Sequence, residues 1–443
     1  MRRFIGGKTD DLSDDAHREG RRRWRLTILG SIFSVLVFLS SQVSMLFRAG
    51  WSLASFRAYY APDQLANFAM VVNGAHGNFS SVEPFTETGT MVDPHLYFTL
   101  LGFVAHLFAV SPAIVYNVAG IGLQVLFVAG LSFGFVLITR RWWSAYLGAL
   151  PYFFGTLSSI IVERWWTPLQ SHAVLWGTFG VMFALNSQSA ALVIAGLLLT
   201  LLVVVAKRRF GATTTAATAV LIGAGLGLLA NIDTYSFFAA LFFASYGLSI
   251  YAMCLRERWW PAAISMALLV LLILVGGAFA SELGRVTVFG LALVPAMPGL
   301  MLAIARWRYL VIAPVLALAA AASPQLIRFV VALHSGDPFL KFREAATVNL
   351  GVPWRSGLLC AAPLLIPLIL ILVGGIHRKN ALWIAYSAGS MVAWFLIAKN
   401  DLWGANQEPY QLWIGGFALT AFTIIPVVID VVLTYRPDWS PSP

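Results

Sequence analysis

The sequence predicts an all-α, polytopic transmembrane helical bundle, and two observations support that fold class. Hydrophobic residues make up 59% of the 443-residue chain and charged residues only 11%, against about 25% charged residues in soluble domains. Apolar runs of about 17 to 25 residues recur, the length that a helix needs to cross a hydrocarbon layer of roughly 30 Å. Helices also keep their backbone hydrogen bonds internal, as lipid requires. We expect about 11 to 13 spans.

The basic residues give a net charge of +10, but they are clustered in the short segments between apolar runs. This is the positive-inside pattern of membrane proteins and argues against a nucleic-acid partner. It predicts a multi-pass protein of the plasma (inner) membrane, with cytoplasmic tails at 1–25 and 436–443 around a transmembrane domain at 26–435. The clusters are Arg21–Arg25, Arg140–Arg141, Lys207–Arg209, Arg256 with Arg258, Arg306 with Arg308, and His377–Lys379.

The first span is predicted over Leu26–Phe47, and it leads outward into a first outer loop at 49–112. In that loop, Pro62 suits the first turn of a short juxtamembrane helix that Gly74 or Gly77 would end. The apolar stretch 94–110 either spans the membrane or lies at its interface. We favour an interfacial helix, because a span there would carry the next basic cluster to the outer side.

The later apolar runs are assigned in alternating directions. Ala113–Ile138 is predicted to cross inward and Ser144–Ile161 to cross back outward. The short run 173–185 is expected to be re-entrant or interfacial, because only an odd number of crossings returns Lys207–Arg209 to the cytoplasm. The spans that follow are Ala190–Ala206, Thr215–Ala230, Phe237–Met253, Ala262–Ala280, Val286–Ala305, Leu310–Leu333, Leu358–Ile376, Leu382–Ala398 and Leu412–Leu433.

The acidic residues are concentrated on the predicted outer side. Of the 19 acids, eight fall in the tails and inward segments, which leaves eleven outside. Acids contribute little to topology, so we interpret their distribution as functional: the outer surface handles cations, protons or a polar substrate. Cys254 and Cys360 lie in or beside apolar runs and are interpreted as packed small hydrophobes.

The first outer loop carries an acid in Tyr60-Ala61-Pro62-Asp63-Gln64 and an acid-proline-aromatic stretch in Asp93-Pro94-His95-Leu96-Tyr97. This layout resembles the GT-C superfamily of polytopic membrane glycosyltransferases, although Asp93-Pro94-His95 departs from the double proline more usual there. The resemblance implies transfer of a sugar from a polyprenyl-phosphate donor to an envelope glycan, glycolipid or protein acceptor at the outer face of the bilayer. It also places Asp63 at the family's catalytic acid position.

Two carboxylates are candidates for the catalytic role. A carboxylate within reach of the acceptor hydroxyl can remove its proton while the anomeric carbon is attacked, and Asp63 is the first candidate. Its alternative role is a stabilising first-turn carboxylate of a helix. Glu163 is the second candidate, because a later outer loop of that superfamily often brings another acid near the first. A salt bridge to Arg164 is the alternative for Glu163.

Other outer residues are candidates for substrate contacts. Arginine suits the carrier phosphate through its planar fork, with Lys341, Arg355 and Arg57 as further outer cations or interfacial anchors. A divalent cation held by Glu83, Asp93 and His95 is the one cofactor that the sequence leaves open, although solvated loop residues are the simpler interpretation. The candidate substrate-binding residues are Tyr60, Gln64, Asp93, His95, Asp233, Arg343, Gln407, Glu408 and Tyr410.

Two other classes of function compete with this interpretation. A membrane transporter or lipid-linked-sugar flippase is the alternative, but the predicted spans hold few of the mid-membrane charges that coupled transporters need. Asp430 comes nearest, and it lies close to the inner end of its span. A structural partner in an envelope complex is the third class, and it predicts that Asp63 can be replaced without effect.

Overall fold

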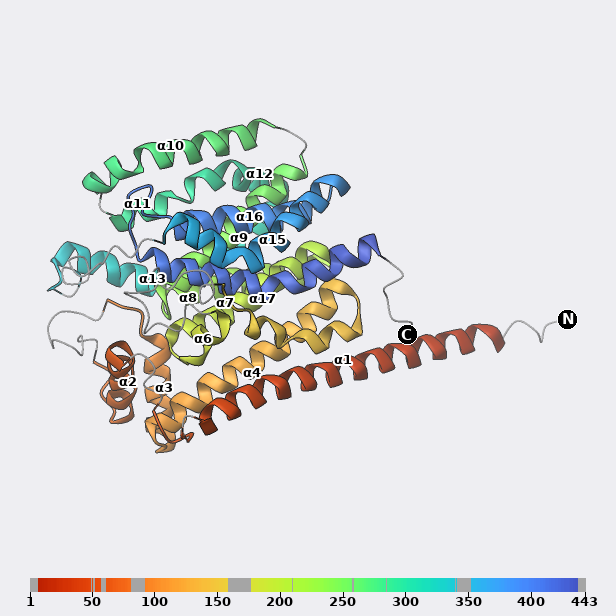
Figure 1. The fold of residues 1–443 in the computed structure, drawn as a ribbon, viewed down its shortest axis with the longest axis horizontal. Helices are drawn as coiled ribbons and strands as arrows, with labels where there is room; N and C mark the ends of the chain where they lie inside the picture. The colour runs from red at the N-terminus through yellow and green to blue at the C-terminus, as the bar shows by residue number, and fades with distance from the viewer. Residues whose placement is uncertain are drawn as a thin grey trace.

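The computed structural model describes residues 7–48, 50, 52–56, 61–80, 92–157, 177–208, 210–256, 259–283, 285–338, 340 and 352–436. This part of the chain is all-helical, and eleven of its segments are long and apolar enough to cross a membrane, as the sequence predicts. Figure 1 shows the long helices side by side in one bundle. They are α1 (Gly7–Arg48), α4 (Pro112–Thr139), α7 (Ser187–Lys207), α8 (Ala212–Leu229), α9 (Thr234–Cys254), α10 (Trp260–Leu283), α13 (Tyr309–Ser335), α15 (Trp354–Arg378), α16 (Ala381–Ala398) and α17 (Pro409–Tyr435), and the eleventh crossing, Val288–Trp307, combines α11 (Arg285–Leu291), η5 (Val294–Ala296) and α12 (Met297–Trp307).

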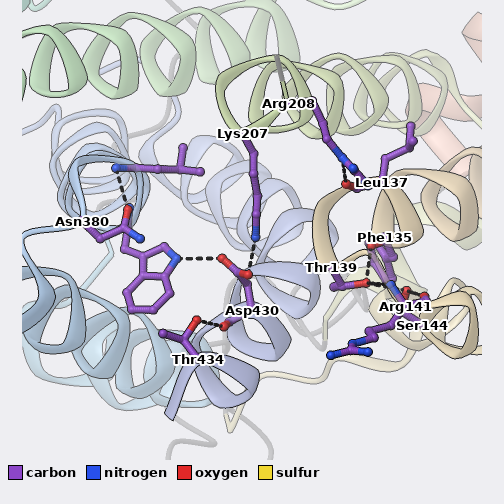
Figure 2. Close-up of polar contacts among 12 residues, drawn as sticks. Phe135, Leu137, Thr139, Arg141, Ser144, Lys207, Arg208, Asn380, Asp430 and Thr434 are labelled. Carbon is purple, nitrogen blue, oxygen red and sulfur yellow. Dashed lines mark hydrogen bonds and ion pairs between the residues drawn. The ribbon is translucent and has the colours of Figure 1, made fainter. Parts of the chain in front are cut away.

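Contacts between distant segments define the two ends of the bundle. At one end, which we call the basic end, Lys207 of α7 pairs with Asp430 of α17, and the Arg208 Nε donates to the Leu137 carbonyl oxygen at 2.6 Å (Figure 2). At the opposite end, which we call the α3 end, the Leu96 backbone N–H donates to the Asn231 carbonyl oxygen at 3.0 Å. The helix termini therefore alternate between the ends as the charge pattern predicts. Which end faces the cytoplasm stays a prediction.

Two short helices, α2 (Ala61–Ala75) and α3 (Leu96–Phe108), lie across the α3 end of the bundle (Figure 1). With 13 residues, α3 is shorter than the roughly 20 residues of a span. Its position at the membrane interface stays a prediction. The start of α2 near Pro62 is confirmed, and Gly77 follows its end with φ of +80°. Such a left-handed conformation suits glycine.

Residues 142–157 pass through the bundle without forming an α-helix. The chain forms two 3-10 turns, η1 (Trp142–Leu147) and η2 (Leu150–Phe153), and the Leu157 N–H then reaches the Cys360 carbonyl oxygen of α15. The prediction of a spanning helix over Ser144–Ile161 is therefore wrong over its described part, 144–157. Pro151 removes a backbone donor. Non-helical backbone at membrane depth requires burial in protein, and Tyr152 is fully buried.

The short run 173–185 is described over residues 177–185. It forms α6 (Thr178–Phe183), which is only six residues long. The Gln124 Nε2 of α4 donates to the Met182 carbonyl oxygen at 2.6 Å, and Gln124 lies about 18 Å along α4 from Pro112. This contact packs α6 against α4 inside the bundle. Whether the run is re-entrant or interfacial stays a prediction.

The tightest packing joins α8 to α13, and α7 and α17 are the most buried of the eleven apolar helices. In α8, Gly223 and Gly227 lie so close to the backbone of α13 that a Cβ would overlap the carbonyl oxygens of Pro314 and Leu318. Such close approach between small residues is typical of membrane helices.

Two helices are exposed over most of their surface. In α10 and α13, only 11% of the most apolar stretch is buried, and the remaining surface faces lipid. The Cys360 side chain packs in the core, as predicted.

Candidate functional site

Three segments that are distant in the sequence meet at the α3 end. They are residues 92–96 before α3, the turn between α8 and α9, and the last third of α13. The Arg328 Nη1 of α13 lies 3.0 Å from the His95 Nε2, and the Gln325 Nε2 donates to the Val92 carbonyl oxygen. The Asn231 Nδ2 donates to the Ala321 carbonyl oxygen at 2.8 Å and so joins the α8–α9 turn to α13. We call Asp93, His95, Asp233 and Arg328 the α3-end cluster.

The His95 ring contacts both a donor and an acceptor in this cluster. The Arg328 Nη1 lies 3.0 Å from the His95 Nε2 and 3.2 Å from its Nδ1, and a guanidinium has donors only. The His95 Nδ1 also lies 3.0 Å from the Asp93 carbonyl oxygen, which can only accept. Burial lowers the pKa of His95 and the charge of Arg328 lowers it further, whereas the bond to the Asp93 backbone and the Asp93 charge act against this. The imidazole can accept a proton while the guanidinium beside it keeps its charge.

Asp233 begins α9 as its N-cap. Its Oδ2 accepts the Ser236 backbone N–H at 2.7 Å, which satisfies one of the free donors at the helix start. Burial raises the pKa of Asp233, the bonds to Ser236 lower it, and the negative charge of the exposed Asp93 raises it. Asp233 is therefore a helix cap. A substrate contact by Asp233 stays a prediction.

The packing of α2 on α3 relates the predicted catalytic residue to the cluster. Gly102 of α3 lies against the Val71 carbonyl oxygen of α2, and the His106 Nδ1 lies 3.0 Å from the Ala75 carbonyl oxygen. From the first contact to the second, the residue numbers increase in both helices, so α2 and α3 run in the same direction. Their first turns therefore lie at the same end of the pair. Asp63 and Gln64 are in the first turn of α2, and His95 directly precedes α3.

The loop before α17 is organised by its own hydrogen bonds. The Asn400 Oδ1 accepts the Gln407 backbone N–H at 2.6 Å, and the Gln407 Nε2 donates to the Ala405 carbonyl oxygen at 3.2 Å. Glu408, with φ of +33°, precedes α17. Tyr410 is buried, and its hydroxyl accepts a hydrogen bond from Gln411. Their predicted sugar contacts stay predictions.

The predicted site extends beyond the part of the chain that the structure describes. Tyr60, Glu83, Glu163 and Arg343 all lie outside it, as do Arg57 and Lys341. Arg355 is described, in the first turn of α15, and it is exposed. The predictions for the undescribed residues stay predictions.

The predicted ligands of a divalent cation were Glu83, Asp93 and His95, and two of these, Asp93 and His95, are described by the structure. Within the described residues, no three His, Cys, Asp or Glu side chains are grouped as a metal site would require. Both ring nitrogens of His95 already have partners, because Nε2 faces Arg328 and Nδ1 faces the Asp93 backbone. Ligation by His95 would require those contacts to break.

Sequence reasoning missed Arg328 and Gln325. Both lie inside the apolar run Leu310–Leu333, which was interpreted only as a span. They are three residues apart and therefore on the same side of α13. Ionisable residues inside spans are uncommon, and they mark functional sites. The pair was therefore the available signal for this site.

A separate apolar cavity of about 80 Å³ lies between α7, α9, α16 and α17. Its walls include Ala206 and Leu382, near the ends of α7 and α16 that meet Asp430 at the basic end. The Tyr386 hydroxyl and the Thr423 Oγ1 form a hydrogen bond of 2.9 Å at its wall. The cavity is therefore in the half of the bundle away from the α3-end cluster.

No family model, curated protein or solved structure matches the chain. The fold itself defines a class, because eleven membrane-length helices form one bundle in the described chain. It is a multi-pass membrane protein.

Proposed function

We propose that the chain is an integral membrane glycosyltransferase that acts at the α3 end of the bundle. The donor would be a sugar on a polyprenyl phosphate, and the acceptor an envelope glycan, glycolipid or protein. The α3-end cluster is the observation that carries the proposal. It combines carboxylates with a guanidinium beside two helices that lie across the end of a lipid-embedded bundle.

The proposed reaction assigns distinct tasks to the acids and the arginine. The acceptor oxygen attacks the anomeric carbon, its proton goes to a carboxylate, and the bond from the anomeric carbon to the phosphate oxygen breaks with its electron pair on the phosphate. Asp63 is the proposed base, and Asp93 is its competitor. Arg328 would stabilise the departing phosphate, since one Nη1 contact to His95 leaves further guanidinium donors for an anion.

In the proposed orientation, the α3 end lies outside the cell and the basic end lies in the cytoplasm. The positive-inside rule supports it, because Arg140 directly follows α4, and Lys207 and Arg378 are the last residues of α7 and α15, all helices that end at the basic end. A prenyl carrier would then approach laterally from the outer leaflet.

The decisive experiment is sugar transfer by the purified protein in proteoliposomes supplied with radiolabelled polyprenyl-phosphate sugars. Arg328→Gln should lower transfer, and either Asp63→Asn or Asp93→Asn should lower it about 100-fold or more, the usual contribution of a general base. Arg285→Gln is the matched control, because Arg285 is an exposed arginine in the first turn of α11. Transfer that is equal in all four variants and the parent would refute the proposed site.

A lipid-linked-sugar flippase is the second candidate, favoured by the 3-10 passage at 142–157. Interrupted helices are frequent in transporters. The same proteoliposomes can distinguish the two functions with a fluorescent polyprenyl-phosphate sugar. Movement of that lipid between leaflets without sugar transfer would identify a flippase.

A further inference from the structure

The first helix has two faces of different character. An α-helix turns about 100° per residue, so the side on which each residue lies follows from its number. The bundle-facing side carries the buried residues, and the Ser34 Oγ on it donates to the Ala145 carbonyl oxygen at 2.8 Å. The buried residues on this side are Thr27, Gly30, Ser31, Ser34, Phe38 and Gln42.

The opposite side of α1 is an exposed apolar stripe. Leu29 is 53% exposed and Leu36 58% exposed, with Ile32 and Val43 on the same side. At about 100° per residue, the mean direction of these side chains around the helix axis is some 180° from that of the buried residues. In a membrane, this stripe faces lipid.

Four exposed arginines continue the apolar stripe beyond the basic end. Arg18, Arg21, Arg22 and Arg25 fall within an arc of about 100° that is centred on the stripe. The other three aromatic or charged residues of 18–25, Glu19, Arg23 and Trp24, lie outside this arc. Trp24 packs on Phe133 of α4 with ring centroids 5.5 Å apart, and Arg23 pairs with Glu19.

We infer that this face of α1 binds an anionic phospholipid in the leaflet at the basic end. Its headgroup phosphate would contact Arg22 and Arg25, with Arg18 and Arg21 further from the bilayer. Its acyl chains would lie along Leu29, Ile32 and Leu36. The inference is independent of the proposed enzymatic activity.

Charge and shape both favour a lipid over a soluble acidic partner. The guanidinium fork matches phosphate oxygens, and basic residues near an anionic membrane surface contribute about 1 kcal/mol each. The charged and apolar parts of the stripe are continuous, as are the headgroup and chains of a lipid. Glu19, three residues from Arg22, pairs with Arg23 on a side of the helix outside the arginine arc.

The test is lipid binding to the delipidated, detergent-solubilised protein, measured by native mass spectrometry. Phosphatidylglycerol and phosphatidylcholine are titrated separately against the parent and against Arg22→Gln/Arg25→Gln. This variant retains Arg18, Arg21 and Arg23, which preserve the charge signal for insertion. The matched control is Arg306→Gln/Arg308→Gln, which removes the same charge from two exposed arginines, one in the last turn of α12 and one directly before α13.

The parent should bind its first phosphatidylglycerol more tightly than phosphatidylcholine. The α1 variant should lose about thirtyfold of that preference, which is ~2 kcal/mol at ~1.4 kcal/mol per factor of ten, and the control should keep it. Equal losses in both variants, or no preference in the parent, would overturn the inference. Glycerol phosphate, the headgroup without chains, should bind much more weakly. If it binds as tightly as the lipid, the apolar stripe has no role and the lipid assignment fails.

Discussion

Replacing Asp430 with asparagine tests the contact that joins three helices at the basic end. Its carboxylate pairs with Lys207 of α7 and accepts the Trp383 indole N–H of α16 at 3.0 Å (Figure 2). The side chains of Lys207 and Asp430 are 20% and 19% exposed. Asparagine keeps an acceptor for the indole but removes the charge, so the variant isolates the ion pair.

The degree of burial sets the expected loss of stability. Removing one partner of a fully buried pair costs about 3–5 kcal/mol, and exposed pairs contribute about 0–1 kcal/mol. A pair that is four-fifths buried lies between these limits, so Asp430→Asn should lower the free energy of unfolding by about 2 kcal/mol. Glu19→Gln is the control, because the pair of Glu19 with Arg23 is 50% and 58% exposed and its loss should cost under about 1 kcal/mol.

The assay is unfolding of the purified protein by SDS in mixed micelles. The buried Cys360 thiol supplies an independent probe, since it should react with a thiol-specific dye only after unfolding. The double variant Lys207→Met/Asp430→Asn should lose less stability than the two single losses added together, because no unpaired charge remains. Additive losses, or an Asp430→Asn variant as stable as the parent, would refute the reasoning.

Two further predictions concern packing and pH. Gly223→Val should destabilise the protein by about 1–3 kcal/mol, because a Cβ there overlaps the Pro314 carbonyl oxygen, whereas Gly122→Ala has open space and should be neutral in the same SDS titration. The lowered pKa of His95 means that the unfolded chain binds protons more readily below its ordinary pKa of 6.5, so this residue's contribution to stability is present above that pH and is lost as the pH falls. His95→Gln should therefore lose less stability than the parent between about pH 7 and pH 5. Parallel pH curves for the two proteins would contradict the lowered pKa of His95, which burial causes first and the charge of Arg328 reinforces.

Hydrophobic run length and charge clusters were sufficient to predict most of the fold. Both signals come from residues that are close together in the sequence, so they do not depend on tertiary contacts. The helices α8 and α17, for example, begin and end within a few residues of the predicted runs. The passage at 142–157 could not be predicted in this way, because its 3-10 form depends on contacts such as Gly148 against Ser132 of α4. A segment that is buried on all sides by protein has an apolar sequence whether or not it forms an α-helix.

The candidate site was harder to predict, because its residues come from three parts of the chain. Asp93, His95 and Asp233 were identified individually from their residue types and loop positions. Their common location follows from tertiary contacts, including the Leu96–Asn231 backbone bond and the Gln325–Val92 bond. Arg328 was hidden in an apolar run for the same reason, since only the fold shows that its side chain faces His95.

The two faces of α1 connect the irregular passage to the surrounding lipid. The backbone of η1 and η2 would be costly in hydrocarbon, and α1 covers it on one side through Ser34 and the Phe38 ring, which lies 4.7 Å from the Tyr152 ring. The same helix needs a firm position along the membrane normal to keep that cover in register. An arginine stripe that binds headgroups would supply it, because Arg25 and Leu29 on one face then mark the boundary between charge and lipid. On this argument, loosening the headgroup contact exposes the 3-10 passage.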